Sequence, residues 1–284
     1  TTIMKSFDNI EGLIIDMDGV LWHGSQALAG LNEFFSTLRE ISMPFILATN
    51  NASLTQSQYV EKLDLLGVNV AADEVLTSSM ATARFLDEHQ PLDKRRVFII
   101  GEEGLRQPLL DYGFTLTDLY QVNQPEKGII HEGADIVVSG LDRQLTWDKL
   151  STATLNLNAG AAFYATNSDT SLPTELGVVM GNGGTLAALE AVTGIKPISI
   201  GKPEPILYQQ ALVKLGTTAE KTVAIGDRLD TDILGAVNAG MRSLLVLTGI
   251  SSESDIEHVD YEPTWIMKDL FEIINALNSM GNMK

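Results

Sequence analysis

Aspartates follow two predicted strands of this chain, and their positions indicate a metal site. An apolar run at residues 12–15 leads into Asp16 and Asp18, and a second run, ending at Ile225, is soon followed by Asp227. Buried parallel strands are typically unbroken apolar runs, and open α/β sheets bind their ligands beyond the carboxyl ends of the strands. Clustered carboxylates that stay ionised need a cation, and an all-oxygen set suits Mg²⁺. The pattern therefore predicts a magnesium site.

Groups suited to phosphate follow two further predicted strands. Thr49 and Asn50 come after the strand predicted at residues 44–48, where a hydroxyl and free backbone amides suit a phosphate oxygen. Lys202 comes after the short strand predicted at residues 198–200 and offers a compact positive charge. These groups could serve the same anionic ligand as the aspartates.

The elements that must position these residues alternate in βα fashion along the chain. Apolar runs predict strands at residues 12–15, 44–48, 74–76, 96–100, 135–139, 162–165, 198–200, 222–225 and 243–247. Helical patterns occupy residues 31–40, 55–66, 146–159, 186–193, 205–215 and 231–239. Such alternation predicts an α/β protein with parallel sheets and helices on both faces.

The candidate residues lie near the two ends of the chain, which indicates an inserted domain. The middle of the chain has its own βα pattern but carries no comparable group after its strands. We therefore expect residues 1–79 and 184–284 to form the core that carries the site. Residues 80–183 are expected to form a second domain inserted into it.

Composition excludes several classes of function. The 19 basic and 37 acidic residues give a net charge of −18, which disfavours nucleic acid and anionic membranes as partners. The absence of cysteine excludes disulfides, thiolate metal sites and a Cys nucleophile. No stretch has the pattern of a signal peptide or a membrane span, so we expect a cytoplasmic location.

The motifs resemble those of a known superfamily. They are Asp16-x-Asp18-Gly-Val, Thr49-Asn50-Asn51, Gly201-Lys202-Pro203 and Gly226-Asp227-x-x-x-x-Asp232. In order and type they resemble the four signature motifs of the haloacid dehalogenase phosphohydrolases. The segment from Asp18 to Trp22 resembles the p-nitrophenyl phosphatase/NagD-like branch. That resemblance implies a Rossmann-like doubly wound parallel-sheet core with an inserted α/β cap of type C2.

The resemblance also implies catalytic roles. Asp16 would attack phosphorus and form an aspartyl-phosphate, which divides one difficult hydrolysis into two easier steps. Asp18 would protonate the leaving oxygen and then activate the water that cleaves this intermediate. Thr49, the amide of Asn50 and Lys202 would bind the phosphoryl group, with Lys202 also neutralising the nucleophile.

The same resemblance implies how Mg²⁺ is held. The carboxylates of Asp16 and Asp227 and the backbone carbonyl of Asp18 would bind it. Asp232 would lie behind them, orienting Lys202 or a metal-bound water. Asp230 is interpreted differently, as an acidic residue in the first turn of a helix that does not touch the metal.

In the inserted domain, one loop is expected to contact the leaving portion of the substrate. Its candidate residues are Asn167, Asp169, Thr170, Ser171 and Glu175. Asn167 and Asp169 match the family pattern and could instead hold the shape of the loop. The acidic side chains would suit a polar or hydroxylated leaving group better than a second phosphate.

These observations predict a Mg²⁺-dependent phosphomonoester hydrolase that acts on a small phosphorylated metabolite and on p-nitrophenyl phosphate. A phosphotransferase would use the same intermediate but pass the phosphoryl group to a hydroxyl. A non-catalytic sensor of a phosphorylated metabolite is the other alternative, although sensing needs neither a nucleophile nor an acid. A homodimer is left open.

Overall fold

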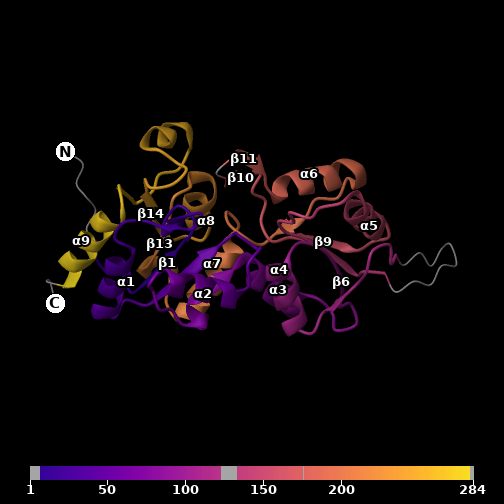
Figure 1. Ribbon diagram of the computed structural model, residues 1–284, viewed down its shortest axis with the longest axis horizontal. Coiled ribbons are helices and arrows are strands. Elements are labelled where there is room, and N and C mark those ends of the chain that lie inside the picture. The colour runs from indigo at the N-terminus through magenta and orange to yellow at the C-terminus, as the bar shows by residue number, and fades with distance from the viewer. Residues whose placement is uncertain (1–6, 123–132, 175, 282–284) are drawn as a thin grey trace. The chain divides into compact units, whose positions relative to one another are not determined.

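The computed structural model describes residues 7–122, 133–174 and 176–281, which form two compact units (Figure 1). The first unit comprises Thr1–Thr49, Ser57–Leu76 and Lys202–Lys284, and the second comprises Asn50–Gln56 and Thr77–Gly201. The chain therefore leaves the first unit and later returns to it.

A six-stranded sheet forms the centre of the first unit. In spatial order its strands are β15 (Trp265–Met267), β14 (Arg242–Val246), β13 (Thr222–Gly226), β1 (Gly12–Ile15), β4 (Phe45–Thr49) and β5 (Val75–Thr77). The pairs from β15 to β4 are parallel, and Ile15 lies beside Ile225 in the register of β1 and β13. The two aspartate-bearing strands are thus neighbours, so their carboxyl ends lie side by side.

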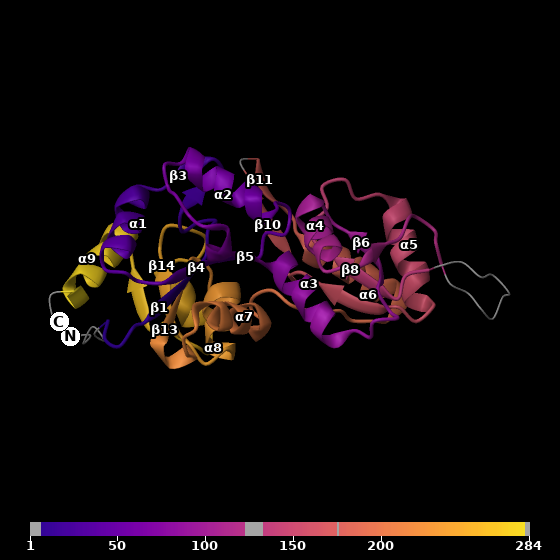
Figure 2. The ribbon, with the colours of Figure 1, turned by 90° about the horizontal axis from the view of Figure 1, so that it is seen from below.

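Helices cover both faces of this sheet (Figure 2). They are α1 (Leu31–Glu40), α2 (Gln56–Leu65), α7 (Pro205–Leu215), α8 (Leu234–Asn238) and α9 (Leu270–Gly281). α1 packs against α9, whereas α7 packs against α8, β1 and β4. A short hairpin, β2 (Trp22–His23) with β3 (Gln26–Ala27), follows β1. The predicted α/β fold with a parallel sheet is confirmed.

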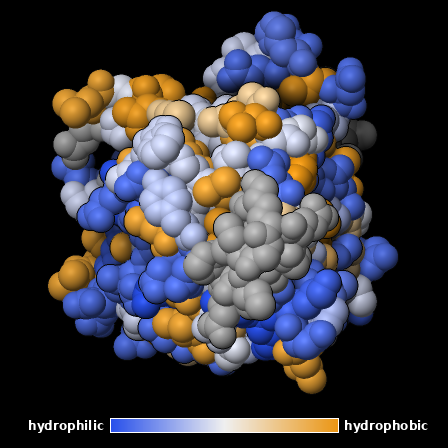
Figure 3. All heavy atoms as spheres, turned by 90° about the vertical axis from the view of Figure 1, so that its right-hand side faces the viewer, coloured by the Kyte–Doolittle hydropathy of each residue, from blue (hydrophilic) through white to orange (hydrophobic). Residues whose placement is uncertain are grey.

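The second unit contains its own parallel sheet. Its strands in spatial order are β12 (Ile198–Ser199), β9 (Ala162–Ala165), β8 (Ile136–Ser139), β6 (Arg96–Ile100) and β7 (Thr115–Leu116). Its helices are α3 (Ser78–His89), α4 (Glu103–Asp111), α5 (Trp147–Asn158) and α6 (Asn182–Thr193). The hairpin of β10 (Ser171–Thr174) and β11 (Gly177–Met180) follows β9. On the face drawn in Figure 3, hydrophobic side chains lie among hydrophilic ones in small groups.

The second unit ends later than the domain boundary expected at residue 183. α6 contributes Leu186 and Leu189 to the same buried cluster as Phe98 of β6 and Phe163 of β9. β12 pairs with β9, so it is an edge strand of the second sheet. The difference arises because the expected boundary followed the positions of the site motifs, whereas the apolar side of α6 decides which unit it joins.

The structure also contains helices that the sequence patterns did not predict, namely α3, α4 and α9. In α3 most of the buried positions are serine, threonine or alanine, including Ser78 and Thr82. Such small side chains give little apolar periodicity. The helix predicted at residues 231–239 is present, but it begins with a π-helical turn at Leu229–Ile233 and continues as the short α8.

Candidate active site

The end of β1 presents Asp16 and then turns back on itself. Asp16 N–H donates to the carbonyl of Ile225 at 2.8 Å, which continues the pairing of β1 with β13. The carbonyl of Met17 accepts hydrogen bonds from the N–H groups of Val20 and Leu21, so the chain folds over within one turn. This turn brings Trp22 back beside Asp18, and the two residues form an isolated β-bridge.

Lys202 links two of the predicted acidic residues. Its Nζ atom donates to Asp16 Oδ1 at 2.5 Å, to Asp232 Oδ1 at 2.6 Å and to the carbonyl of Ala48 at 3.1 Å. The Lys202 side chain is 2% exposed, and that of Asp232 equally so. A buried ammonium needs such acceptors, because an unpaired charge away from water is costly.

Backbone N–H groups hold the side chains of Asp227 and Asp232. Asp227 Oδ2 accepts from Ile250 N–H at 2.8 Å, and Asp232 Oδ2 accepts from Arg228 N–H at 3.2 Å. Both oxygens of Asp232 therefore already accept hydrogen bonds, one from Lys202 and one from the backbone. This leaves Asp16 and Asp227 as the better candidates for direct metal ligands.

Glycines allow the backbone to approach these carboxylates. A Cβ atom on Gly249 would lie 1.9 Å from Asp227 Oδ2, and one on Gly19 would lie 2.4 Å from the same atom. Gly19 also has a φ of 81°, in the left-handed region that favours glycine. Sequence reasoning missed Gly249, although it too follows a strand, β14, at the carboxyl edge of the sheet.

Burial and mutual repulsion shift the titration of the cluster. Burial raises the pKa of Asp16 well above its usual range, with Lys202 opposing and the charges of Asp232 and Asp227 reinforcing the shift. Burial also raises the pKa of Asp227 to about 7, helped by the charge of Asp232. Burial would lower the pKa of Lys202, but the charges of Asp16 and Asp232 raise it well above its usual range.

The donor set of this cluster fits a hard divalent cation. One carboxylate oxygen from each of Asp16, Asp227 and Asp232 lies within 4.8 Å of the others. Lys202 compensates one of the three charges, so the ionised cluster keeps an excess of negative charge. Oxygen donors with excess negative charge are what Mg²⁺ requires, and the residues present therefore fit the ion expected from the sequence.

The predicted phosphate-binding residues fall in both units. Thr49 ends β4, beside β1, and its side chain is buried. Asn50 belongs to the second unit, where its carbonyl accepts from Asn167 Nδ2 at 2.8 Å and from Ser78 Oγ at 2.9 Å. The Nδ2 group of Asn50 donates to Asp169 Oδ2 at 3.2 Å. The backbone of Asn50 is therefore fixed by contacts within the second unit.

The candidate substrate loop begins with a buried residue, Asn167, and continues with more exposed residues. Asn167 is 4% exposed, and its carbonyl accepts from Asn182 Nδ2 at 2.7 Å. Thr170 is exposed and Ser171 is half-buried. Glu175 lies outside the described residues. Asn167 has a clear structural role, whereas substrate contact by the other candidates stays a prediction.

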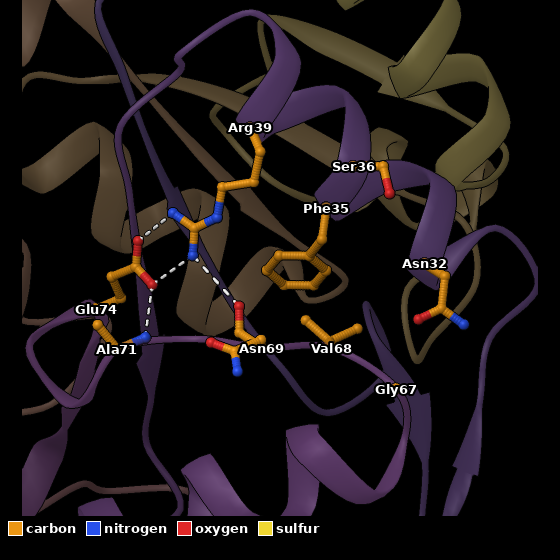
Figure 4. Close-up of a pocket in the computed structure, with 9 residues that line it drawn as sticks. All are labelled: Asn32, Phe35, Ser36, Arg39, Gly67, Val68, Asn69, Ala71 and Glu74. Atoms are coloured by element: carbon orange, nitrogen blue, oxygen red, sulfur yellow. Dashed lines mark hydrogen bonds and ion pairs between the residues drawn. The ribbon is translucent and has the colours of Figure 1, made fainter.

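A pocket of about 720 Å³ elsewhere in the first unit is separate from these residues (Figure 4). It lies beside α1, and Phe35 and Val68 form part of its wall. Arg39 donates to both carboxylate oxygens of Glu74, at 2.5 and 2.7 Å, along its edge. None of the predicted site residues that the structure describes lines it.

Comparison with known proteins identifies the family of this chain. A family model described as haloacid dehalogenase-like hydrolase matches residues 13–115, and a second HAD-hydrolase-like model matches residues 199–273. An acid sugar phosphatase of Staphylococcus saprophyticus is 37% identical over 269 residues, which are 95% of this chain and 98% of that protein. The chain belongs to the haloacid dehalogenase-like hydrolases. Because its relatives of this family include a phosphatase and a 5'-nucleotidase, it is a hydrolase of phosphate monoesters, and the expected family is confirmed.

Two further relatives of this hydrolase also match it over nearly the full length of both chains. The 5'-nucleotidase YutF of Bacillus subtilis is 36% identical over 95% of this chain and 99% of that protein. The crystal structure of a 4-nitrophenylphosphatase from Thermotoga maritima has a TM-score of 0.85 and 36% identity, covering 95% of this chain and 98% of that one.

Among the described residues of the hydrolase, no helix combines the length and apolar character needed to cross a bilayer.

Proposed function

We propose that this hydrolase is a Mg²⁺-dependent phosphomonoesterase that acts through an aspartyl-phosphate on Asp16. The observation that carries the proposal is the ion pair of Lys202 Nζ with Asp16 Oδ1 at 2.5 Å, inside a cluster that also contains Asp227. The Lys202 ammonium opposes the rise that burial causes in the pKa of Asp16, so near an anionic phosphate it favours an ionised Asp16 carboxylate. That carboxylate can then serve as a nucleophile rather than a simple hydrogen-bond acceptor.

In the first step, an oxygen of Asp16 would form a bond to phosphorus while the bond to the leaving oxygen breaks. Asp18 would donate its proton to that leaving oxygen. In the second step, Asp18 would take a proton from water as the water oxygen bonds to phosphorus. The bond between Asp16 and phosphorus then breaks, inorganic phosphate is released and both carboxyl groups return to their starting forms.

Charge around the phosphoryl group would be balanced by groups of this chain and by the metal. Lys202 would contact a phosphoryl oxygen in addition to Asp16, and Thr49 and the Asn50 amide would bind the others. Asp16, Asp227 and the carbonyl of Asp18 would hold Mg²⁺, which when bound supplies positive charge that stabilises the transferring group. The hydrogen bonds of Asp232 support its role in orienting Lys202.

We further propose that the second unit is the cap domain and that the substrate is a small phosphorylated metabolite with a hydroxylated leaving group. The names of the relatives, an acid sugar phosphatase and a 5'-nucleotidase, support this class. The position of Thr170 and Ser171 after β9 supports their contact with the leaving group. Cytoplasmic location and homodimer formation stay predictions.

A phosphate-release assay tests the proposal. Purified protein is incubated with p-nitrophenyl phosphate and Mg²⁺, with and without an acceptor alcohol, and in excess chelator. We expect one phosphate per p-nitrophenol in every reaction with metal and essentially none in chelator. Phosphate release that falls below p-nitrophenol release when alcohol is added would instead identify a phosphotransferase, and full activity in chelator would exclude the metal role.

A further inference from the structure

The hydrogen bond between Trp22 and Asp18 has no role in the proposed function as stated above. Trp22 Nε1 donates to Asp18 Oδ1 at 2.8 Å. The side chain of Trp22 is fully buried, whereas Asp18 is exposed. An exposed aspartate samples several rotamers in solvent, so a bond from a buried and immobile donor restricts its carboxyl group.

The indole ring is fixed from several sides. Lys62 Nζ of α2 lies 4.0 Å from the ring centroid of Trp22 and donates to the carbonyl of Gly24 at 3.0 Å. The carbonyl of Trp22 accepts from Gly19 N–H at 2.8 Å, and the carbonyl of Gly19 accepts from Thr248 Oγ1 at 2.7 Å. The residue that donates to Asp18 is therefore held at its ring by Lys62 and at its backbone by hydrogen bonds that extend through Gly19 to Thr248.

Indole N–H can only donate a hydrogen bond. While the bond to Trp22 is present, Asp18 Oδ1 must act as the acceptor. When Asp18 carries a proton, Oδ2 is the favoured position for it, because the carbonyl oxygen of a carboxylic acid accepts a hydrogen bond better than its hydroxyl oxygen does. The contact thus selects which oxygen of Asp18 delivers the proton, and it fixes the direction in which that oxygen points.

We propose that Trp22 is a positioning residue that orients the Asp18 carboxyl group for proton transfer to the leaving oxygen. This inference rests on the proposed acid and base role of Asp18. Trp22 acts through Asp18 and does not contact the phosphoryl group. Its loss should be felt most by substrates whose leaving oxygen needs a proton, because p-nitrophenolate departs as a stable anion.

The test compares kcat/KM for an alkyl phosphate and for p-nitrophenyl phosphate, since this parameter reports the first step for both. Trp22→Phe should lower the alkyl value about 10-fold more than the p-nitrophenyl value, a part of the ~10²–10⁴-fold that proton transfer can supply. Replacing the Trp22 indole by benzothiophene keeps the ring shape but removes the donor, and should give the same bias. This second variant carries the test if Trp22→Phe does not fold. Trp265→Phe is the matched control, because Trp265 is also buried but lies on β15, where it packs against Phe7.

Asp18→Asn separates failure of this inference from failure of the proposed function. If Asp18→Asn slows the alkyl substrate selectively but both Trp22 variants slow the two substrates equally, Trp22 is only a packing residue. If Asp18→Asn itself shows no selectivity, the acid role fails and this proposal falls with it. A double variant adds a second measurement: in the Asp18→Asn background, Trp22→Phe should no longer change the ratio of the two substrates.

Discussion

At the scale of single residues, Asp16 should be indispensable for turnover. Asp16→Asn replaces the carboxylate whose oxygen attacks phosphorus with an uncharged amide. We expect kcat to fall at least ~10³-fold with the fold intact. Asp230→Asn is the matched control, because Asp230 is exposed and pairs with Arg228 outside the acidic cluster. Steady-state kinetics and circular dichroism measure both effects. A folded Asp16→Asn enzyme that keeps more than about a tenth of the activity would exclude the covalent route.

Gly249 should be required for metal binding, because the absence of a side chain there leaves room for the Asp227 carboxylate. A methyl group there would lie 1.9 Å from Asp227 Oδ2, so Gly249→Ala must displace this carboxylate or the loop. We expect the Mg²⁺ concentration for half-maximal activity to rise about 10- to 100-fold, the usual effect of disturbing the support of a ligand. In the control Gly12→Ala, the new methyl group would meet no atom closer than 3.4 Å. An unchanged Mg²⁺ requirement in Gly249→Ala would argue against Asp227 as a ligand.

At the scale of elements, the Arg39–Glu74 pair joins α1 to the segment before β5. Burial would raise the pKa of Glu74, but hydrogen bonds from Arg39 and from Ala71 N–H lower it below its usual range. A lowered folded-state pKa means that the pair stabilises the fold above the pKa of an unfolded glutamate. This contribution is lost as the pH falls through the lower folded-state value.

Glu74→Gln should therefore lower the free energy of unfolding at neutral pH by about 1 kcal/mol or less, because the pair is partly exposed. The difference from the wild type should shrink as the pH falls below about 4. Urea unfolding at a series of pH values measures it. Glu40→Gln, an exposed substitution in the last residue of α1, should show no such trend. A difference that grew toward acid pH would contradict the argument.

At the scale of the whole molecule, the two units are expected to divide catalysis and selectivity. Thr170→Ala and Ser171→Ala should change the ranking of sugar phosphates and nucleotides while affecting p-nitrophenyl phosphate much less. A small activated ester needs little from a leaving-group pocket. Parallel measurement of kcat/KM on a panel of phosphate esters tests this division. Equal losses on every substrate would assign both residues to the structure of the loop.

The sequence alone determined the candidate chemistry of this hydrolase because its central strands can be recognised from local sequence. β1 and β13 are unbroken apolar runs, and their ends carry Asp16 and Asp227 directly. Since parallel strands present their carboxyl ends at one edge, spacing and residue type were enough to predict that these carboxylates meet. Short-range patterns also predicted α1 and α7 with the observed limits.

Tertiary structure decided what depends on contacts between distant segments. Residues far apart in sequence meet in two contacts of the site. Gly249 lies against Asp227, and the Lys62 ammonium lies over the Trp22 ring. α6 joined the second unit because its buried leucines pack on that sheet, which no local motif records. Periodicity reports which side of an element is buried. The partner that buries it is chosen only when the whole chain packs.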